Sequence, residues 1–113
     1  MMLGGSNCQL HGVELARGKG VYTLLIDYTP NPPAKTLASA HIQISTCDVE
    51  GCIEAGKAYK ITGVMTMGTD QPVYTAACVS QALGLPTLIS PEDAFAVTNK
   101  KRMKEILTRA SIP

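Results

Sequence analysis

The sequence predicts an α/β fold: a three-layer sandwich with one five-stranded parallel sheet, in the order 3-2-1-4-5, and helices on both faces. Short β-branched or apolar runs alternate along the chain with segments of about ten residues that have helical apolar spacing. Every connection is long enough for a right-handed crossover between parallel strands. The 113 residues are 45% hydrophobic and 17% charged, which is typical of one ordered domain with a modest core.

The first half of the chain supplies three strands and two helices. Residues 1–3 are the first strand, and the helix that follows is expected to end at Gly18. The run 21–26 predicts a buried second strand, which stops at Asp27 and the proline-rich loop 29–33. Residues 41–44 alternate like a third strand, and Asp48 can N-cap the second helix.

The second half continues the alternation. Residues 61–67 are expected to form the fourth strand, and Pro72 lies in the first turn of a helix closed by Gly84. Residues 87–89 are expected to form the fifth strand. Ser90 then begins a capping box, and Asn99 caps a last amphipathic helix.

Composition and charge argue against several classes of protein. The net charge of +1 lacks the basic excess of a nucleic-acid-binding surface. No apolar run approaches the roughly 18–20 residues that span a bilayer, and no signal peptide is recognisable. We therefore expect a cytoplasmic protein with neither nucleic-acid nor membrane partners.

The cysteines and histidines have no spacing that is typical of a site. The cysteines form no C-x-x-C pair and have no histidine at ligand spacing, so we expect reduced thiols, no disulfide and no metal. His11 and His41 lack an evident partner and are expected to be structural or solvated. The four cysteines are Cys8, Cys47, Cys52 and Cys78.

Two polar loops are the candidate ligand site. Ligands of open parallel sheets bind outside the carboxyl ends of the strands, where strand order reverses. In the order 3-2-1-4-5 this places the loop 4–9 opposite the loop 68–70. Glycines let the backbone approach a ligand, and polar side chains at a helix N-terminus supply donors that favour anions. The predicted substrate-binding residues are Gly4, Gly5, Ser6, Asn7, Gln9, Gly68, Thr69 and Asp70.

Both loops also have a purely structural interpretation, which the sequence leaves open. The first can be a tight turn with an ordinary N-cap, and Asp70 can cap the helix that begins at Pro72. A dinucleotide site is a further alternative, because Asp27 follows Gly5 by 22 positions, at the end of the second strand. The loop lacks the third glycine of G-x-G-x-x-G, so this signal is weak.

Four segments in order resemble a known family: LGGSNCQ, LIDYTPNPPAK, GVMTMGTDQPVYTAACVSQALGLP and TNKKRMKEILTRASIP. They are similar to the N-terminal domain of ATP-grasp enzymes, above all proteins like the carbamoyl-phosphate synthase large subunit. Biotin carboxylase and D-alanine–D-alanine ligase are more distant members. The resemblance implies that residues 1–113 form a single Rossmann-like domain, with 99–113 the helix that leads into an absent ATP-grasp domain.

The resemblance also implies a function. In the intact enzyme, an ATP-dependent ligase would phosphorylate a carboxylate to an acyl phosphate, which an amine or thiol attacks. ATP and magnesium would belong mainly to the absent domain, with no cofactor bound and no catalytic residue in this fragment. Lys100 matches a lysine that contacts the nucleotide phosphates, although Lys101 is adjacent and the register can differ by one. The expected partners are the ATP-grasp domain and a small carboxylate, with a homodimer as a further open alternative.

The sequence departs from the family pattern in two places. Gly-Gly-Ser stands where three glycines are usual, and Ser111 replaces a C-cap glycine. Two rival hypotheses also remain: a stand-alone module that binds a dinucleotide or another small ligand, and an interaction domain that dimerises through an exposed helix face. A lysine-bearing helix that closes with Ile112-Pro113 favours the ligase hypothesis over the stand-alone module.

Overall fold

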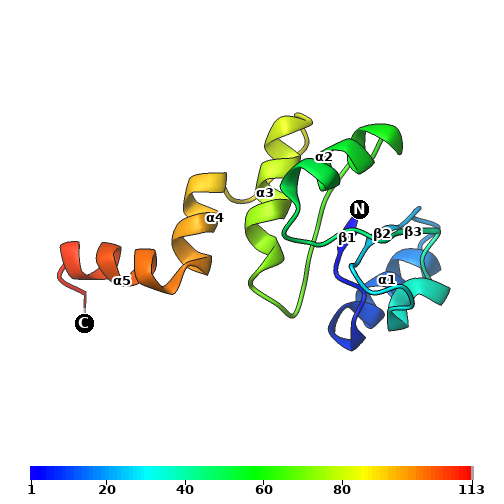
Figure 1. Cartoon of the computed structure of the whole chain (residues 1–113), viewed down its shortest axis with the longest axis horizontal. Coiled ribbons are helices and arrows are strands. Elements are labelled where there is room, and N and C mark those ends of the chain that lie inside the picture. The colour runs from blue at the N-terminus through cyan, green and yellow to red at the C-terminus, as the bar shows by residue number, and fades with distance from the viewer. Residues whose placement is uncertain (113) are drawn as a thin grey trace.

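The structure is a computed structural model that describes residues 1–112 (Figure 1). Strands and helices alternate through the first half, and helices make up the second half. The elements in order are β1 (Met2–Leu3), α1 (Asn7–Gly18), β2 (Leu24–Ile26), the 3-10 helix η1 (Pro33–Thr36), β3 (Ala40–Ile42), α2 (Val49–Ala58), α3 (Pro72–Ala82), α4 (Pro91–Thr98) and α5 (Lys100–Arg109).

The sheet is parallel throughout, as predicted, but in the described residues it has three strands rather than five. β2 lies between β1 and β3, with Leu3 opposite Ile26 and Ile26 opposite Ile42. The segment 61–67, expected to be the fourth strand, contributes only one parallel bridge, between Met65 and Met2. This bridge places Met65 on the free side of β1, where the fourth strand was expected.

The predicted fifth strand at 87–89 is wrong, and its local hydrogen bonds explain why. The Thr87 hydroxyl donates to the Ile89 carbonyl at 2.8 Å and accepts the Ile89 N–H at 3.3 Å. These bonds use the backbone groups that a sheet ladder would need. The side chain of Leu88 is fully exposed at 107%, so the segment also buries nothing that would hold it against a sheet.

Two apolar clusters lie on opposite faces of the sheet. One contains Leu24 and Ile26 of β2 with Cys52 of α2 and Val79 of α3. The other contains Leu25 of β2 and packs beneath α1 and η1. Because successive strand residues point to opposite faces, the fully buried β2 serves both clusters. Figure 1 shows α1 and α2 on opposite sides of the strands, which gives the three layers expected from the sequence.

Three of the predicted helix N-caps are confirmed. The carboxylate of Asp48 accepts the Gly51 N–H at 3.0 Å, and the side chain of Asn99 accepts the Arg102 N–H at 3.0 Å. The side chain of Ser90 likewise caps α4. These caps satisfy N–H groups that the first turn of a helix leaves unpaired.

Two other predicted helix boundaries are corrected. Gly18 is the last residue of α1 rather than its cap, and the left-handed residue is Gly20, with φ of 70°. Asp70 does not cap α3, whose N-cap position is Gln71, without a side-chain hydrogen bond. Pro72 at the first helical position needs no backbone acceptor, which lowers the demand for a cap there.

Four helices end on a left-handed residue, and two of these residues are not glycine. Gly20 and Gly84 follow α1 and α3, whereas Lys60 and Ser111 follow α2 and α5 with φ of 50° and 55°. After α5, the Ser111 N–H donates to the Thr108 carbonyl at 3.1 Å and the next N–H donates to the Leu107 carbonyl at 2.9 Å. This is the Schellman pattern, so Ser111 occupies the position that favours glycine.

The last two helices form an arm. α4 packs on α3, and α5 packs on α4, leading away from the sheet so that the longest dimension of the molecule is 47 Å (Figure 1). In the described part of the chain, no helix combines the length and the apolar character needed to cross a membrane.

Candidate functional site

The structure brings the two predicted loops into direct contact. The side-chain amide of Gln9 donates to the Met67 carbonyl at 2.5 Å. Gly68 has a φ of 73°, and a Cβ atom built on it would lie only 2.7 Å from the Cβ atom of Cys8. Because an ordinary side chain does not fit there, glycine at position 68 is what allows the loops to approach so closely.

The backbone of the first loop is held by its neighbour on the sheet. The Gly4 N–H donates to the Ile26 carbonyl at 2.8 Å, and the Gly5 N–H donates to the Asp27 carboxylate at 2.7 Å. A Cβ atom on Gly5 would lie 2.9 Å from the Cβ atom of Pro32. Gly5 therefore serves a close approach between two loops, while Gly4 supplies a positive φ of 96°.

Asp27 is a buried carboxylate with three internal donors. It is 8% exposed and accepts the Thr29 N–H at 2.8 Å and the Thr29 hydroxyl at 2.7 Å, besides the Gly5 N–H. Burial raises the pKa of Asp27. The hydrogen bonds from Thr29 and Gly5, together with the nearby His41, lower the pKa by more than burial raises it, so the net pKa lies below its ordinary value. The carboxylate is thus ionised and engaged inside the protein.

This arrangement argues against a dinucleotide site. The acidic residue that would bind a ribose hydroxyl is Asp27, and both of its oxygens already accept hydrogen bonds from the protein. His41 also has a partner within the protein, because its Nε2 lies 3.2 Å from the Asp27 carbonyl oxygen.

A capping box closes the start of α1. The Ser6 hydroxyl accepts the Cys8 N–H at 3.3 Å, and the side-chain oxygen of Gln9 accepts both the Ser6 N–H at 3.1 Å and the Ser6 hydroxyl at 2.6 Å. Gln9 is only 1% exposed. Both amide atoms of the Gln9 side chain already have partners in the protein, which argues against its predicted role as a ligand donor. Ser6 and Asn7, by contrast, are exposed.

The second loop is exposed and reaches a third loop of the same edge. Thr69 and Asp70 are both exposed. Gln71 accepts the Thr46 hydroxyl at 3.0 Å, and its amide lies 2.7 Å from the sulfur of Cys47. Sequence reasoning missed this link between the loops after β3 and before α3, because the residues are far apart in the chain and form no motif.

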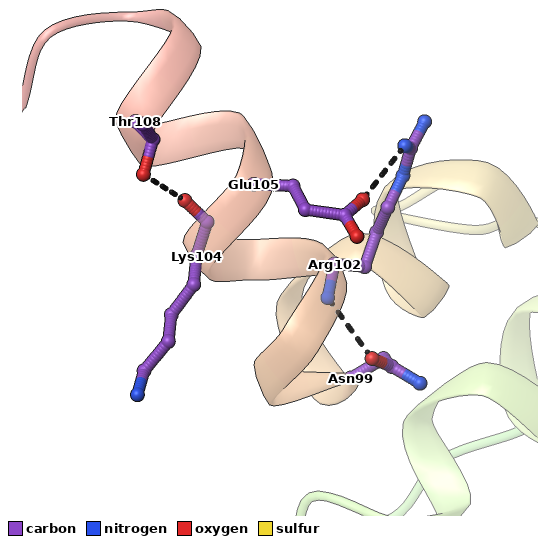
Figure 2. Close-up of polar contacts among 5 residues, drawn as sticks. All are labelled: Asn99, Arg102, Lys104, Glu105 and Thr108. Carbon is purple, nitrogen blue, oxygen red and sulfur yellow. Dashed lines mark hydrogen bonds and ion pairs between the residues drawn. The ribbon is translucent and has the colours of Figure 1, made fainter.

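Lys100 lies on the arm rather than at the loops. It is the first residue of α5 and is exposed, and no described contact joins it to residues 4–9 or 68–70. Figure 2 shows the neighbouring part of this helix: Asn99 caps it, Arg102 pairs with Glu105 at 3.4 Å, and the Lys104 side chain extends away from that pair. The predicted phosphate contact of Lys100 therefore stays a prediction.

Other features lie apart from the loops. A cavity of about 460 Å³ opens at the amino-terminal end of the strands, and no predicted site residue lines it. Among residues 1–112, no three His, Cys, Asp or Glu side chains come together in a way that could hold a metal ion. The candidate site is therefore the pair of loops at the carboxyl edge.

Comparison with known proteins identifies the fold. No protein-family model and no curated protein sequence matches the chain. Among solved structures, phosphoribosylglycinamide synthetase from Anaerococcus prevotii superimposes with a TM-score of 0.82 and 22% identity over 96% of this chain. The chain therefore shares its fold with a part of this synthetase. Identity at this level establishes the fold and leaves the activity to be argued.

Two further solved structures share this fold. N5-carboxyaminoimidazole ribonucleotide synthetase from Thermotoga maritima has a TM-score of 0.71, 22% identity and 99% coverage of this chain. The N5-carboxyaminoimidazole synthetase from Staphylococcus aureus, solved with ADP, has a TM-score of 0.71, 16% identity and 97% coverage. The present chain spans only 28% to 30% of the length of these three structures. The finer resemblance to carbamoyl-phosphate synthase stays a prediction.

Proposed function

We propose that this chain is the N-terminal, substrate-side domain of an ATP-dependent ligase of the ATP-grasp type. The observation that carries the proposal is the superposition on a synthetase with a TM-score of 0.82 over 96% of the chain. The contact between the two predicted loops, through Gln9, Met67 and Gly68, supports it. In parallel α/β sheets, ligands bind at this carboxyl edge.

In this proposal the chain orients a substrate, and the rest of the enzyme activates it. Ser6, Asn7, Thr69 and Asp70 offer exposed polar groups at the loop junction, and Gln9 holds the loops together. ATP supplies the phosphoryl group: a carboxylate oxygen attacks the γ-phosphorus, ADP leaves, and an amine or thiol then displaces phosphate from the acyl carbon. Lys100 contributes a positive charge toward the nucleotide phosphates.

The exposed apolar side chains of the arm support a partner domain. Phe95 and Val97 of α4 are 46% and 57% exposed, and Ile106 of α5 is 40% exposed. Exposed apolar side chains of this size are candidates for an interface. The ATP-grasp domain of the same protein is the partner that we propose for the arm, and a second copy of the chain is the alternative.

The test uses the full-length protein expressed from the complete reading frame. We expect release of ADP and phosphate to require both a carboxylate and an amine or thiol, measured over a panel of each. Residues 1–113 alone are expected to release no ADP and to bind ATP weakly. Calorimetry that shows micromolar ATP binding to residues 1–113, or full-length protein that never consumes ATP with any pair, would contradict the proposal.

A further inference from the structure

We infer that the cavity at the amino-terminal end of the strands binds a small aromatic carboxylate, with the ring between apolar walls and the carboxylate at Lys60. The volume of about 460 Å³ lies within the range of roughly 300–1,000 Å³ that is typical of small-molecule sites. The cavity shares no residue with the loops 4–9 and 68–70, so the inference is independent of the proposed function.

The walls of the cavity are the segments that lead into neighbouring strands. β1 lies between β2 and Met65, and the cavity is lined on one side by residues 21–24 and on the other by residues 59–65. Met2 and Leu24, both buried, contribute its inner surface. This inner surface is apolar, so it suits the hydrocarbon part of a ligand.

The polar groups of the inner surface are already bonded within the protein. The buried Thr23 receives the Ser39 hydroxyl oxygen at 3.0 Å on its N–H, and its own hydroxyl donates to the Val21 carbonyl at 3.4 Å. The Met1 amino group donates to the Gly63 carbonyl at 2.8 Å and adds no negative charge. A ligand therefore finds apolar contact rather than free hydrogen-bonding groups at the inner end.

Exposed aromatic and apolar side chains gather at the mouth of the cavity. Tyr22 and Val21 come from the segment before β2, and Tyr59 and Met65 come from the opposite wall. Single exposed apolar residues are ordinary, but here four of them line one cavity. A planar ring placed between the two walls would remove apolar surface from water on both of its faces.

The charge of the lining selects an anion. Lys60 is the only charged side chain that lines the cavity, and it takes part in no ion pair within residues 1–112. A cationic ligand would meet no carboxylate there, whereas a carboxylate would pair with the Lys60 ammonium. A single lysine suits a single negative charge better than a di- or triphosphate.

The backbone at Lys60 is a second, independent observation. Its φ of 50° is left-handed, a conformation that favours glycine. The Lys60 N–H donates to the Lys57 carbonyl at 3.1 Å and the Ile61 N–H donates to the Gly56 carbonyl at 3.1 Å, which fixes this turn at the end of α2. Left-handed residues other than glycine concentrate at functional sites. Here the strained position carries the one charged side chain of the cavity.

The test is an NMR titration of the whole chain with 2-naphthoate, followed through backbone amide signals at constant ionic strength. Two matched probes separate the contributions: 2-naphthalenemethanol has the ring without the charge, and acetate has the carboxylate without the ring. We expect 2-naphthoate at submillimolar concentration to shift the signals of Tyr22, Thr62 and Gly63. The alcohol should shift the same signals with lower affinity, and acetate should shift none of them.

Lys60→Gly separates loss of binding from loss of folding. It should weaken binding of 2-naphthoate about fivefold, the upper end for an exposed ion pair, and leave binding of the alcohol unchanged. Because glycine relieves the left-handed strain, the variant should unfold at a higher temperature than wild type although it binds less well. Ser111→Gly relieves the same strain outside the cavity and should leave the affinity for 2-naphthoate unchanged.

A pair of tyrosine variants tests the aromatic wall. Tyr22→Ala should weaken binding of both the acid and the alcohol, because it removes apolar contact that the two probes share. Tyr28 is also exposed but lies outside the cavity, so Tyr28→Ala should weaken neither.

Three outcomes would overturn the inference. The first is 2-naphthoate that shifts none of the cavity signals. The second is an acid and an alcohol that bind equally well, with no effect of Lys60→Gly. The third is self-association in sedimentation equilibrium that shifts the signals of Tyr22 and Met65 on dilution and is not reversed by 2-naphthoate, which would make the cavity an interface between two copies of the chain.

Discussion

The Asp27 carboxylate accepts the Gly5 N–H at 2.7 Å, so the end of β2 fixes the loop that leaves β1. Asp27→Ala should lower the free energy of unfolding by about 1.5–3 kcal/mol, the usual contribution of hydrogen bonds to a charged group. Urea denaturation at pH 7 measures this loss. Asp70→Ala, which removes an exposed carboxylate, should change stability by less than about 0.5 kcal/mol.

The same carboxylate predicts part of the acid sensitivity. The pKa of Asp27 is lower in the folded protein than its ordinary value of 3.8, so the unfolded chain binds its proton first as the pH falls. Its stabilising contribution is complete above about pH 5 and is lost as the pH falls through the folded pKa. Asp27→Asn should therefore lose less stability than wild type between pH 5 and pH 2, by urea denaturation. If both proteins lost the same free energy of unfolding between pH 5 and pH 2, this prediction would be contradicted.

Three glycine-to-alanine variants distinguish the effect of the steric contact with Cys8 from the effect of backbone strain at a positive φ. Gly68→Ala meets both a positive φ and the Cβ atom of Cys8, Gly84→Ala meets only a positive φ, and Gly63→Ala meets neither. We expect losses of about 1–2 kcal/mol for Gly84→Ala, more for Gly68→Ala, and little for Gly63→Ala. Thermal unfolding of the three variants tests this order, and equal losses at positions 68 and 84 would refute a steric role for Cys8.

The two left-handed residues that are not glycine offer stabilising substitutions. Lys60→Gly and Ser111→Gly should each raise stability by up to about 1 kcal/mol, because glycine adopts this conformation without the Cβ penalty. Helical circular dichroism during heating provides the measurement, with Lys57→Gly, inside α2, as a destabilising control.

The nucleotide contact proposed for Lys100 can be tested in the full-length protein. Lys100→Ala should raise the Michaelis constant for ATP by about ten- to a hundredfold, the value of a charge-assisted contact of about 1.5–3 kcal/mol. Lys104→Ala removes an exposed lysine one turn farther along α5 and should change it little (Figure 2). If Lys101→Ala carries the loss instead, the register of the assignment is wrong by one residue.

The cysteines should react in an order set by exposure. Cys8 and Cys47 are exposed, whereas burial, with Asp48 and Cys47 nearby, raises the pKa of Cys52 to about 11. Because the thiolate is the reactive form, a thiol reagent at pH 8 should label the two exposed cysteines first and Cys52 last. Under denaturing, non-reducing conditions all four should react. Fewer than four would indicate a disulfide.

The sequence predicted best those features that depend on a few neighbouring residues. The caps at Asp48 and Asn99 follow from side chains that bond N–H groups three positions ahead, and both are present. The strand at 87–89 failed because Thr87 satisfies the local backbone itself, a competition that apolar pattern alone does not reveal.

Predictions of the candidate site were also limited to what neighbouring residues determine. Its two loops were placed correctly in space from the expected strand order, and Gln9 and Gly68 bring them together. Gln9 is engaged by Met67, 58 positions away in the sequence. The Gly5 N–H donates to Asp27, 22 positions away, rather than to a ligand. Residue type and spacing carry no information about whether such a donor is already used.

The position of the far end of α5 depends on the angle at which α5 packs on α4. α5 has 10 residues and is therefore about 15 Å long, and it packs on α4 rather than on the sheet. A tilt of about 10° at the joint between the two helices would swing its far end by about 2.6 Å, close to one hydrogen-bond length. The aromatic contact of Tyr74 with Phe95, 5.8 Å between ring centres, holds α4 to α3 at the base of the arm. Repacking of these two rings would tilt α4 on α3 and carry α5 with it.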